Sequence, residues 1–130
     1  MSWEDHTNEL LSTNSVSGAY ILGKDDGTVY AQSGTPALSE AEAEEFAKYF
    51  KNGCTGPSLL LGGKKYMRAR YREDIEAVYM VTKKGGICAG VTKTLLVIGV
   101  WCQEANDKLT AGECNKAVQA KMEGFLDDNY

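Results

Sequence analysis

Apolar residues recur at helical spacing in three segments of this chain. Each segment follows a serine or threonine, and an acidic residue stands three positions after that hydroxyl, which is the arrangement of a capping box. The three pairs are Ser2 with Asp5, Ser39 with Glu42, and Thr110 with Glu113. The pattern predicts helices over about residues 2–12, 40–51 and 111–127.

Each predicted helix has one apolar stripe, which it would bury against the rest of the fold. The stripes consist of Trp3, Leu10 and Leu11 in the first helix, Phe46 and Phe50 in the second, and Val118, Met122, Phe125 and Leu126 in the third. On the exposed side of the second helix, Glu44 and Lys48 are spaced to form an ion pair.

The segments between these helices are short, apolar or alternating, and separated by glycine-containing turns such as Asp25-Asp26-Gly27, a pattern typical of antiparallel strands. The predicted strands cover residues 16–22, 28–32, 59–61, 64–72, 75–82, 87–93 and 95–101. Six or seven such strands predict a single α+β domain over residues 1–130. We expect a central antiparallel β-sheet with the N- and C-terminal helices on one face and a further helix on the other.

Composition is that of an ordinary globular domain, with 43% hydrophobic and 25% charged residues in a chain of 130. A chain of this length buries a sizeable core without disulfides or metal. The longest apolar run, residues 95–101, is too short to span a bilayer, and no basic, then apolar, secretory signal precedes the first helix. We therefore expect a cytoplasmic protein.

The residues that carry chemistry form no catalytic or metal-binding set. The four cysteines are widely spaced, without a C-x-x-C pair, and His6 is the one histidine, so neither zinc nor a redox motif is expected. The segment 62–65, Gly-Gly-Lys-Lys, is too short for a phosphate-binding loop and leads into a strand. The sequence thus predicts no enzyme, no metal and no cofactor.

Charge is distributed unevenly along the chain. Residues 64–84 hold seven basic and three acidic side chains, a net charge of +4, whereas the remainder has a net charge of −8. A nucleic-acid-binding protein would be basic overall, so that class is not expected. The basic segment fits an acidic protein surface or an anionic lipid, or it protects strand edges from aggregation.

Large apolar side chains stand at both ends of the chain, namely Trp3 near the start and Phe125, Leu126 and Tyr130 near the end. Chain ends are normally polar, so these side chains have two interpretations. They pin the terminal helices to the core, or they form an aromatic patch for an extended proline-rich peptide, which loses little entropy on docking.

Several segments together resemble the profilin family over essentially the whole chain, with the plant and protist members most similar. The matching segments are Ser2-Trp3, residues 26–33 (DGTVYAQS), residues 61–67 (LGGKKYM), residues 83–86 (KKGG) and residues 110–115 (TAGECN). The resemblance implies a monomeric, non-enzymatic protein of the cytoplasm and cytoskeleton. It implies binding of monomeric actin, regulation of its nucleotide exchange and filament assembly, binding of proline-rich ligands such as formins, and binding of phosphatidylinositol bisphosphate.

The resemblance also implies which residues form each site. The proline-binding groove between the terminal helices would consist of Trp3, His6, Tyr30, Phe125, Leu126 and Tyr130. The family usually has tyrosine where His6 stands and tryptophan where Tyr30 stands, so a weakened groove is expected. His6 keeps a flat ring but can become charged near pH 6.5, which would lower affinity for an uncharged proline ligand.

The resemblance places actin binding on the basic strands and the start of the last helix, at Lys65, Arg70, Lys83, Lys84, Gly112, Asn115 and Lys116. Phosphoinositide binding would involve Arg68, Arg70, Arg72, Lys83 and Lys84. Strict alternation puts Lys65 on the opposite strand face from the arginines, so either a bulge changes the face or Lys65 lies outside the patch. Two alternatives remain: an adaptor that binds proline-rich peptides but not actin, and a small ligand-sensing α+β module.

Overall fold

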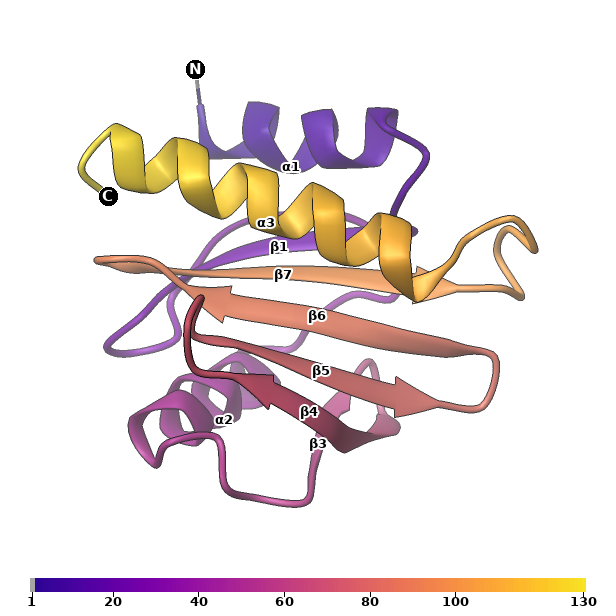
Figure 1. The fold of residues 1–130 in the computed structure, drawn as a ribbon, viewed down its shortest axis with the longest axis horizontal. Helices are drawn as coiled ribbons and strands as arrows, with labels where there is room; N and C mark the ends of the chain where they lie inside the picture. Colours follow the sequence, from indigo (N-terminus) through magenta and orange to yellow (C-terminus); the bar gives the residue numbers. More distant parts are fainter. Residues whose placement is uncertain (1) are drawn as a thin grey trace.

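A seven-stranded antiparallel sheet forms the centre of the protein (Figure 1). The structure is a computed structural model that describes residues 2–130. The strand order is β2-β1-β7-β6-β5-β4-β3. The strands are β1 (Gly18–Gly23), β2 (Val29–Gly34), β3 (Ser58–Leu61), β4 (Lys64–Arg72), β5 (Ala77–Thr82), β6 (Gly85–Val91) and β7 (Leu95–Cys102).

Helices cover both faces of the sheet, as the sequence predicts. Helix α1 (Trp3–Ser12) and helix α3 (Ala111–Asp127) lie side by side on one face, and α2 (Glu40–Lys51) covers the other (Figure 1). Ser2 and Ser39 form complete capping boxes, and the Thr110 side chain accepts a hydrogen bond from the Glu113 N–H. The predicted fold class and the bounds of α2 and α3 are confirmed.

The sheet separates two hydrophobic cores. Tyr20 and Ile98 belong to the core under α2, whereas Ile21 and Val97 belong to the core under α1 and α3. Strands β1 and β7 are therefore buried on both faces, which explains why their sequences are apolar without alternation. Helix α3 packs closely because β7 offers Gly99, where a Cβ atom would lie only 2.5 Å from Val118.

The carboxylate of Glu42 ties the start of α2 to the turn before β4. Its Oε1 accepts hydrogen bonds from the N–H groups of Ser39 and Gly62, both at 3.1 Å, and its Oε2 accepts one from Gly63 at 2.9 Å. Burial opposes ionisation, but the bonds from Gly63, Ser39 and Gly62 together lower the pKa of Glu42 below its ordinary value of 4.5. Glu42 thus fixes where the basic strand β4 begins.

Replacing Glu42 with alanine should lower the free energy of unfolding by about 1–2 kcal/mol, because charge-assisted hydrogen bonds are lost at a partly exposed site. Since folding lowers the pKa of Glu42, its ionised form stabilises the fold above about pH 4.5, and this contribution is lost as the pH falls through the lower folded value. Urea unfolding at pH 7 and below pH 4 measures both effects. Glu44→Ala, at an exposed position of the same helix, is the matched control, and an equal loss there would contradict the role of Glu42.

Some local predictions are wrong or only partly right. Lys48 pairs with Glu45 at 3.5 Å rather than with Glu44. Phe50 is half-buried, whereas its neighbour Tyr49 is buried and donates a hydrogen bond to the Gly56 carbonyl at 2.7 Å. The four cysteines are free thiols. No helix in residues 2–130 is long and apolar enough to cross a bilayer.

Candidate functional site

Rings from the two terminal segments and from β2 meet at one end of the sheet. Trp3 stacks on Tyr30, with ring centroids 5.7 Å apart and planes 23° apart. The rings of Tyr130 and Trp3 form a T-shaped contact, with ring centroids 5.1 Å apart and planes 74° apart. These three rings, which we call the ring trough, come from α1, β2 and the segment after α3. Tyr30 and Tyr130 remain 47% and 43% exposed, so the trough is open to solvent.

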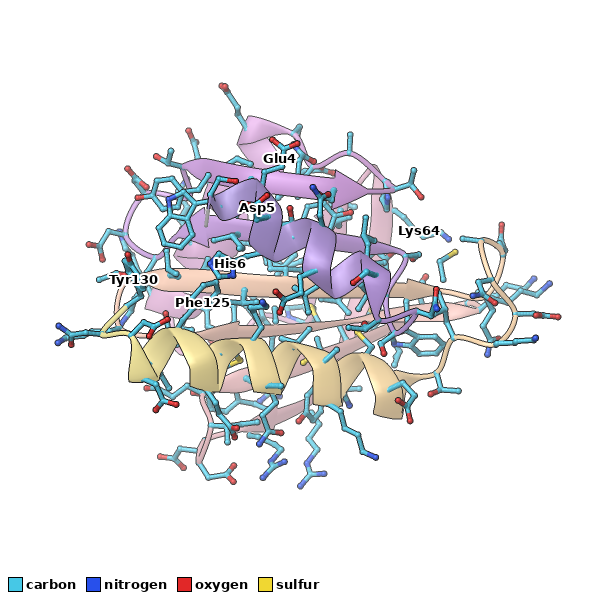
Figure 2. All side chains as sticks on the ribbon, turned by 90° about the horizontal axis from the view of Figure 1, so that it is seen from above. Glu4, Asp5, His6, Lys64, Phe125 and Tyr130 are labelled. Atoms are coloured by element: carbon cyan, nitrogen blue, oxygen red, sulfur yellow. The ribbon has the colours of Figure 1, made fainter. Side chains whose placement is uncertain are left out.

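Phe125 supports the ring trough from below. It is only 1% exposed, and its ring packs against three others. The distances between ring centroids are 5.8 Å to Trp3, 6.3 Å to Tyr130 and 4.7 Å to His6. Figure 2 shows His6 and Phe125 beside each other between α1 and α3, with Tyr130 close to them. Both interpretations of the terminal rings therefore hold in part, because Phe125 pins the helices to the core while Tyr30 and Tyr130 face solvent.

Leu126 does not join the other predicted groove residues. It is 52% exposed and lines a different hollow with Ile75, Val91 and Lys93, next to the turn between β6 and β7. The reason is helical geometry, since one residue along α3 turns a side chain by about 100° away from Phe125. Leu126 thus lies outside the ring trough.

A groove of about 270 Å³ runs between α1 and α3 and continues from the ring trough. His6 and Phe125 lie at its junction with the trough, and Lys121 lies within it. The Lys121 Nζ is 2.7 Å from Glu9 Oε1 and 3.3 Å from His6 Nδ1. Its spacing of four residues from Phe125 could have indicated that Lys121 lies on the same side of α3. Its partners on α1 could not have been found in this way, because they are 112 and 115 residues away in sequence.

A bulge in β4 decides which basic side chains share a face. Arg68 pairs with Met80 and Arg70 pairs with Tyr79, so Ala69 is an extra residue between two consecutive partners on β5. From Arg70 onward the alternation of side chains is therefore shifted by one position.

Because of this bulge, Lys65, Arg70 and Arg72 lie on one face of the sheet, with Tyr79, which packs towards the core under α3. We call this side of β3, β4 and β5 the outer face. The question of Lys65 is thereby settled, since the bulge brings the later arginines to its face. Arg68 lies on the α2 side, where its charge acts on the Cys54 thiol.

Exposed apolar side chains accompany the basic residues on the outer face. Met67 and Val81 are cross-strand partners, and Leu60 lies opposite Lys65. All three are exposed although they are large and hydrophobic. The sequence analysis missed them, and the signal that could have found them is alternation within each strand, since each directly follows or precedes a buried residue, namely Leu59, Tyr66 and Met80.

The remaining predicted residues gather at the end of the sheet away from the ring trough. Lys83 and Lys84 are exposed in the turn between β5 and β6, and the Lys84 carbonyl accepts a hydrogen bond from Gln103 in the loop before α3. This turn and the start of α3 lie at the same end in Figure 1. The predicted residues on α3, which are Gly112, Asn115 and Lys116, are exposed or half-buried there.

Arg72 differs from the other basic side chains because it already has a partner. Its guanidinium donates two hydrogen bonds to Asp74, at 3.2 and 2.6 Å. The bond from Arg72 lowers the pKa of the Asp74 carboxyl. This pairing leaves Arg72 less free to hold an anion than Arg70. Within residues 2–130 no His, Cys, Asp and Glu side chains are grouped to hold a metal ion.

Two solved structures with the same fold contain ligands. One is described as mouse profilin IIa in complex with a double repeat from the FH1 domain of mDia1, with 18% identity, a TM-score of 0.72 and full coverage of both chains. The other is described as a LokiProfilin1/rabbit actin complex, with 22% identity, a TM-score of 0.72, and coverage of 95% of this chain and 93% of that chain. At these identities they show a shared fold.

More similar proteins cover nearly the whole chain. The crystal structure of Acanthamoeba castellanii profilin II is 25% identical, has a TM-score of 0.85, and matches 99% of this chain and all of that one. Profilin-1 of Dictyostelium discoideum is 30% identical and matches 99% of this chain and 98% of its own length. The family model described as Profilin matches residues 1–130. This chain therefore belongs to the profilin family.

Proposed function

We propose that this protein binds monomeric actin with its outer face and proline-rich segments with its ring trough, and that it thereby regulates nucleotide exchange and filament assembly. The observation that carries the proposal is the open arrangement of Trp3, Tyr30 and Tyr130. Flat aromatic faces stack on proline rings, and the indole N–H and tyrosine hydroxyls donate hydrogen bonds to the free carbonyls of a polyproline helix.

Actin binding is supported by the combination of charge and apolar surface on the outer face. Met67 and Val81 supply an exposed apolar centre, and Lys65 and Arg70 supply positive charge beside it. An interface of this kind has an apolar centre with a polar rim. The LokiProfilin1/rabbit actin complex, in which actin is bound to a protein of the same fold, adds support.

The start of strand β4 and the ring trough lie at opposite ends of the molecule, so we infer that both partners can bind together. Lys64, at the start of β4, lies at the opposite end of the molecule from Tyr130 (Figure 2). A protein that holds actin at one end and a proline-rich assembly factor, such as a formin, at the other raises the local concentration of actin near that factor.

Titration with poly-L-proline and sedimentation of actin test the two halves separately. We expect poly-L-proline to bind, and we expect the protein to lower the fraction of actin in filaments at low salt. A ligand-sensing module is disfavoured because the rings line an open trough rather than an internal pocket. Binding of poly-L-proline without any effect on actin would instead support the adaptor alternative.

Replacing Lys83 and Lys84 with glutamate should slow association with actin by roughly tenfold at low salt, with a smaller change in the dissociation rate. The reason is that exposed charges steer the encounter of two proteins more than they hold the complex. Stopped-flow kinetics at several salt concentrations measure both rates. The double reversal Lys48→Glu and Lys51→Glu on α2 changes the net charge equally at a different surface, and an equal slowing there would contradict steering by the turn between β5 and β6.

Phosphoinositide binding is a second proposal for the basic end of the protein. Lys83, Lys84 and Arg70 are exposed cations, and an anionic headgroup would compete with actin for them. Arg68, on the other sheet face, and Arg72, paired with Asp74, would contribute less. Vesicles containing phosphatidylinositol bisphosphate should release actin from the protein, and vesicles of neutral lipid should not.

A further inference from the structure

Lys121 connects the two terminal helices within the groove that continues from the ring trough. Its side chain is only 11% exposed, and its ammonium reaches the Glu9 carboxylate at 2.7 Å and the His6 ring at 3.3 Å. Neither the family resemblance nor the sequence pattern assigns a role to this lysine. Its burial in the groove between α1 and α3 requires a reason, because lysine side chains are usually exposed.

The chemistry of the contact fixes the state of His6. A lysine ammonium has three donors and no acceptor, so Nδ1 of His6 must accept the hydrogen bond. A nitrogen that accepts carries no proton, and the proton of the neutral ring then belongs to Nε2. Lys121 thus leaves His6 neutral with one N–H donor. The hydroxyl of the tyrosine usual at this position would also supply one donor.

We propose that Lys121 is a positioning residue that holds His6 as a neutral Nε2–H donor at the edge of the ring trough, and that proline-peptide binding is consequently weakened in acid. This inference rests on the proposed proline-binding function. The acid sensitivity follows because a proton on Nδ1 breaks the hydrogen bond from Lys121 and places two positive charges about as close as the bond had been. The contact between α1 and α3 then has to rearrange, and the ring trough, to which both helices contribute, rearranges as well.

The groups around His6 act in both directions. Burial lowers the pKa of His6, the charge on Lys121 lowers it further, and the nearby carboxylates Glu9 and Asp5 raise it, with a net decrease from 6.5. Asp128 of α3 lines the same groove. Strands β1 and β2, on which α1 rests, contain no Asp, Glu, Lys, Arg or His. A peptide that covers the ring adds to the burial, so binding further disfavours the protonated form.

The free protein provides the first test, which does not depend on any ligand. Because His6 is the one histidine, two-dimensional ¹H–¹⁵N NMR of the imidazole ring reports its tautomer and its titration without assignment ambiguity. We expect Nε2 of His6 to be protonated and Nδ1 to be unprotonated at neutral pH. Lys121→Met keeps the length of the side chain and removes the charge, so the titration midpoint of His6 should rise. Lys108→Met, in the exposed loop before α3, should leave the midpoint unchanged.

The second test is binding of poly-L-proline as a function of pH. We expect affinity to be about threefold to tenfold weaker near pH 5 than near pH 8, equivalent to a further decrease of roughly half to one unit in the pKa of His6 on binding. His6→Phe keeps the ring but cannot titrate, so it should remove the pH dependence. In Lys121→Met the loss of affinity should begin at a higher pH.

Any one of three results would overturn the inference. They are an unprotonated Nε2 of His6 in the free protein, an unchanged titration midpoint of His6 in Lys121→Met, and a pH dependence of poly-L-proline binding in His6→Phe equal to that of the native protein. Failure of poly-L-proline to bind at pH 8 would instead overturn the proposed function. In that case the tautomer and the midpoint shift still decide whether Lys121 positions His6.

Discussion

Replacing Trp3 with alanine should weaken binding of poly-L-proline by more than about 2 kcal/mol, or roughly 30-fold. Trp3 is the central ring of the site, because it contacts Tyr30, Tyr130, Phe125 and His6, with ring centroids 5.1 to 6.0 Å apart. Its removal takes away a stacking surface and also the ring on which Tyr30 rests. Isothermal titration calorimetry measures the affinity without relying on tryptophan fluorescence.

Two controls separate loss of the ligand surface from loss of the fold. Trp3→Phe keeps a ring but lacks the indole N–H, so its affinity should lie between those of the native protein and Trp3→Ala. Thermal unfolding of both variants shows whether the helices remain packed. A folded Trp3→Ala variant with native affinity would contradict the ring trough as the proline site.

The second large effect is expected at Phe125, where alanine should lower the free energy of unfolding by about 3–5 kcal/mol. The phenyl ring is fully buried, and it fills the space beneath Trp3, Tyr130 and His6, so its removal leaves a cavity where both terminal helices meet. Chemical denaturation with guanidinium chloride measures the loss.

Leu126 provides a matched comparison one residue further along the same helix. Because its side chain is exposed and faces a different hollow, Leu126→Ala should change stability by no more than about 0.5 kcal/mol and leave poly-L-proline binding intact. If Leu126→Ala weakened binding as much as Trp3→Ala, our placement of Leu126 outside the ring trough would be wrong.

Most of the fold could be predicted from the sequence because local and global signals agree in it. Helix α2 begins after Ser39, whose side chain and that of Glu42 satisfy each other's backbone groups, and both of its bounds were predicted. The strands were found through their turns, and the two-sided burial of β1 and β7 matches their continuous apolar sequences.

The candidate site was harder to predict because it depends on geometry that spacing does not encode. Residue type does not distinguish Phe125 from Leu126, since both are large and apolar, and the way α3 packs on the sheet decides that Phe125 is buried and Leu126 exposed. The contact of Lys121 with His6 joins residues 115 positions apart in sequence. Such long-range contacts follow from the assembled fold rather than from any motif.

The extra residue Ala69 has an evolutionary consequence. With Ala69 deleted, β4 would pair without a bulge, and Arg70 and Arg72 would keep their partners Tyr79 and Ala77 and therefore their face. A regular strand that kept Ala69 would instead turn both arginines to the α2 side, which would move two positive charges across the sheet without any amino-acid replacement. In related genes, the length of this strand and its bulge are therefore as informative about partner choice as the identities of the arginines themselves.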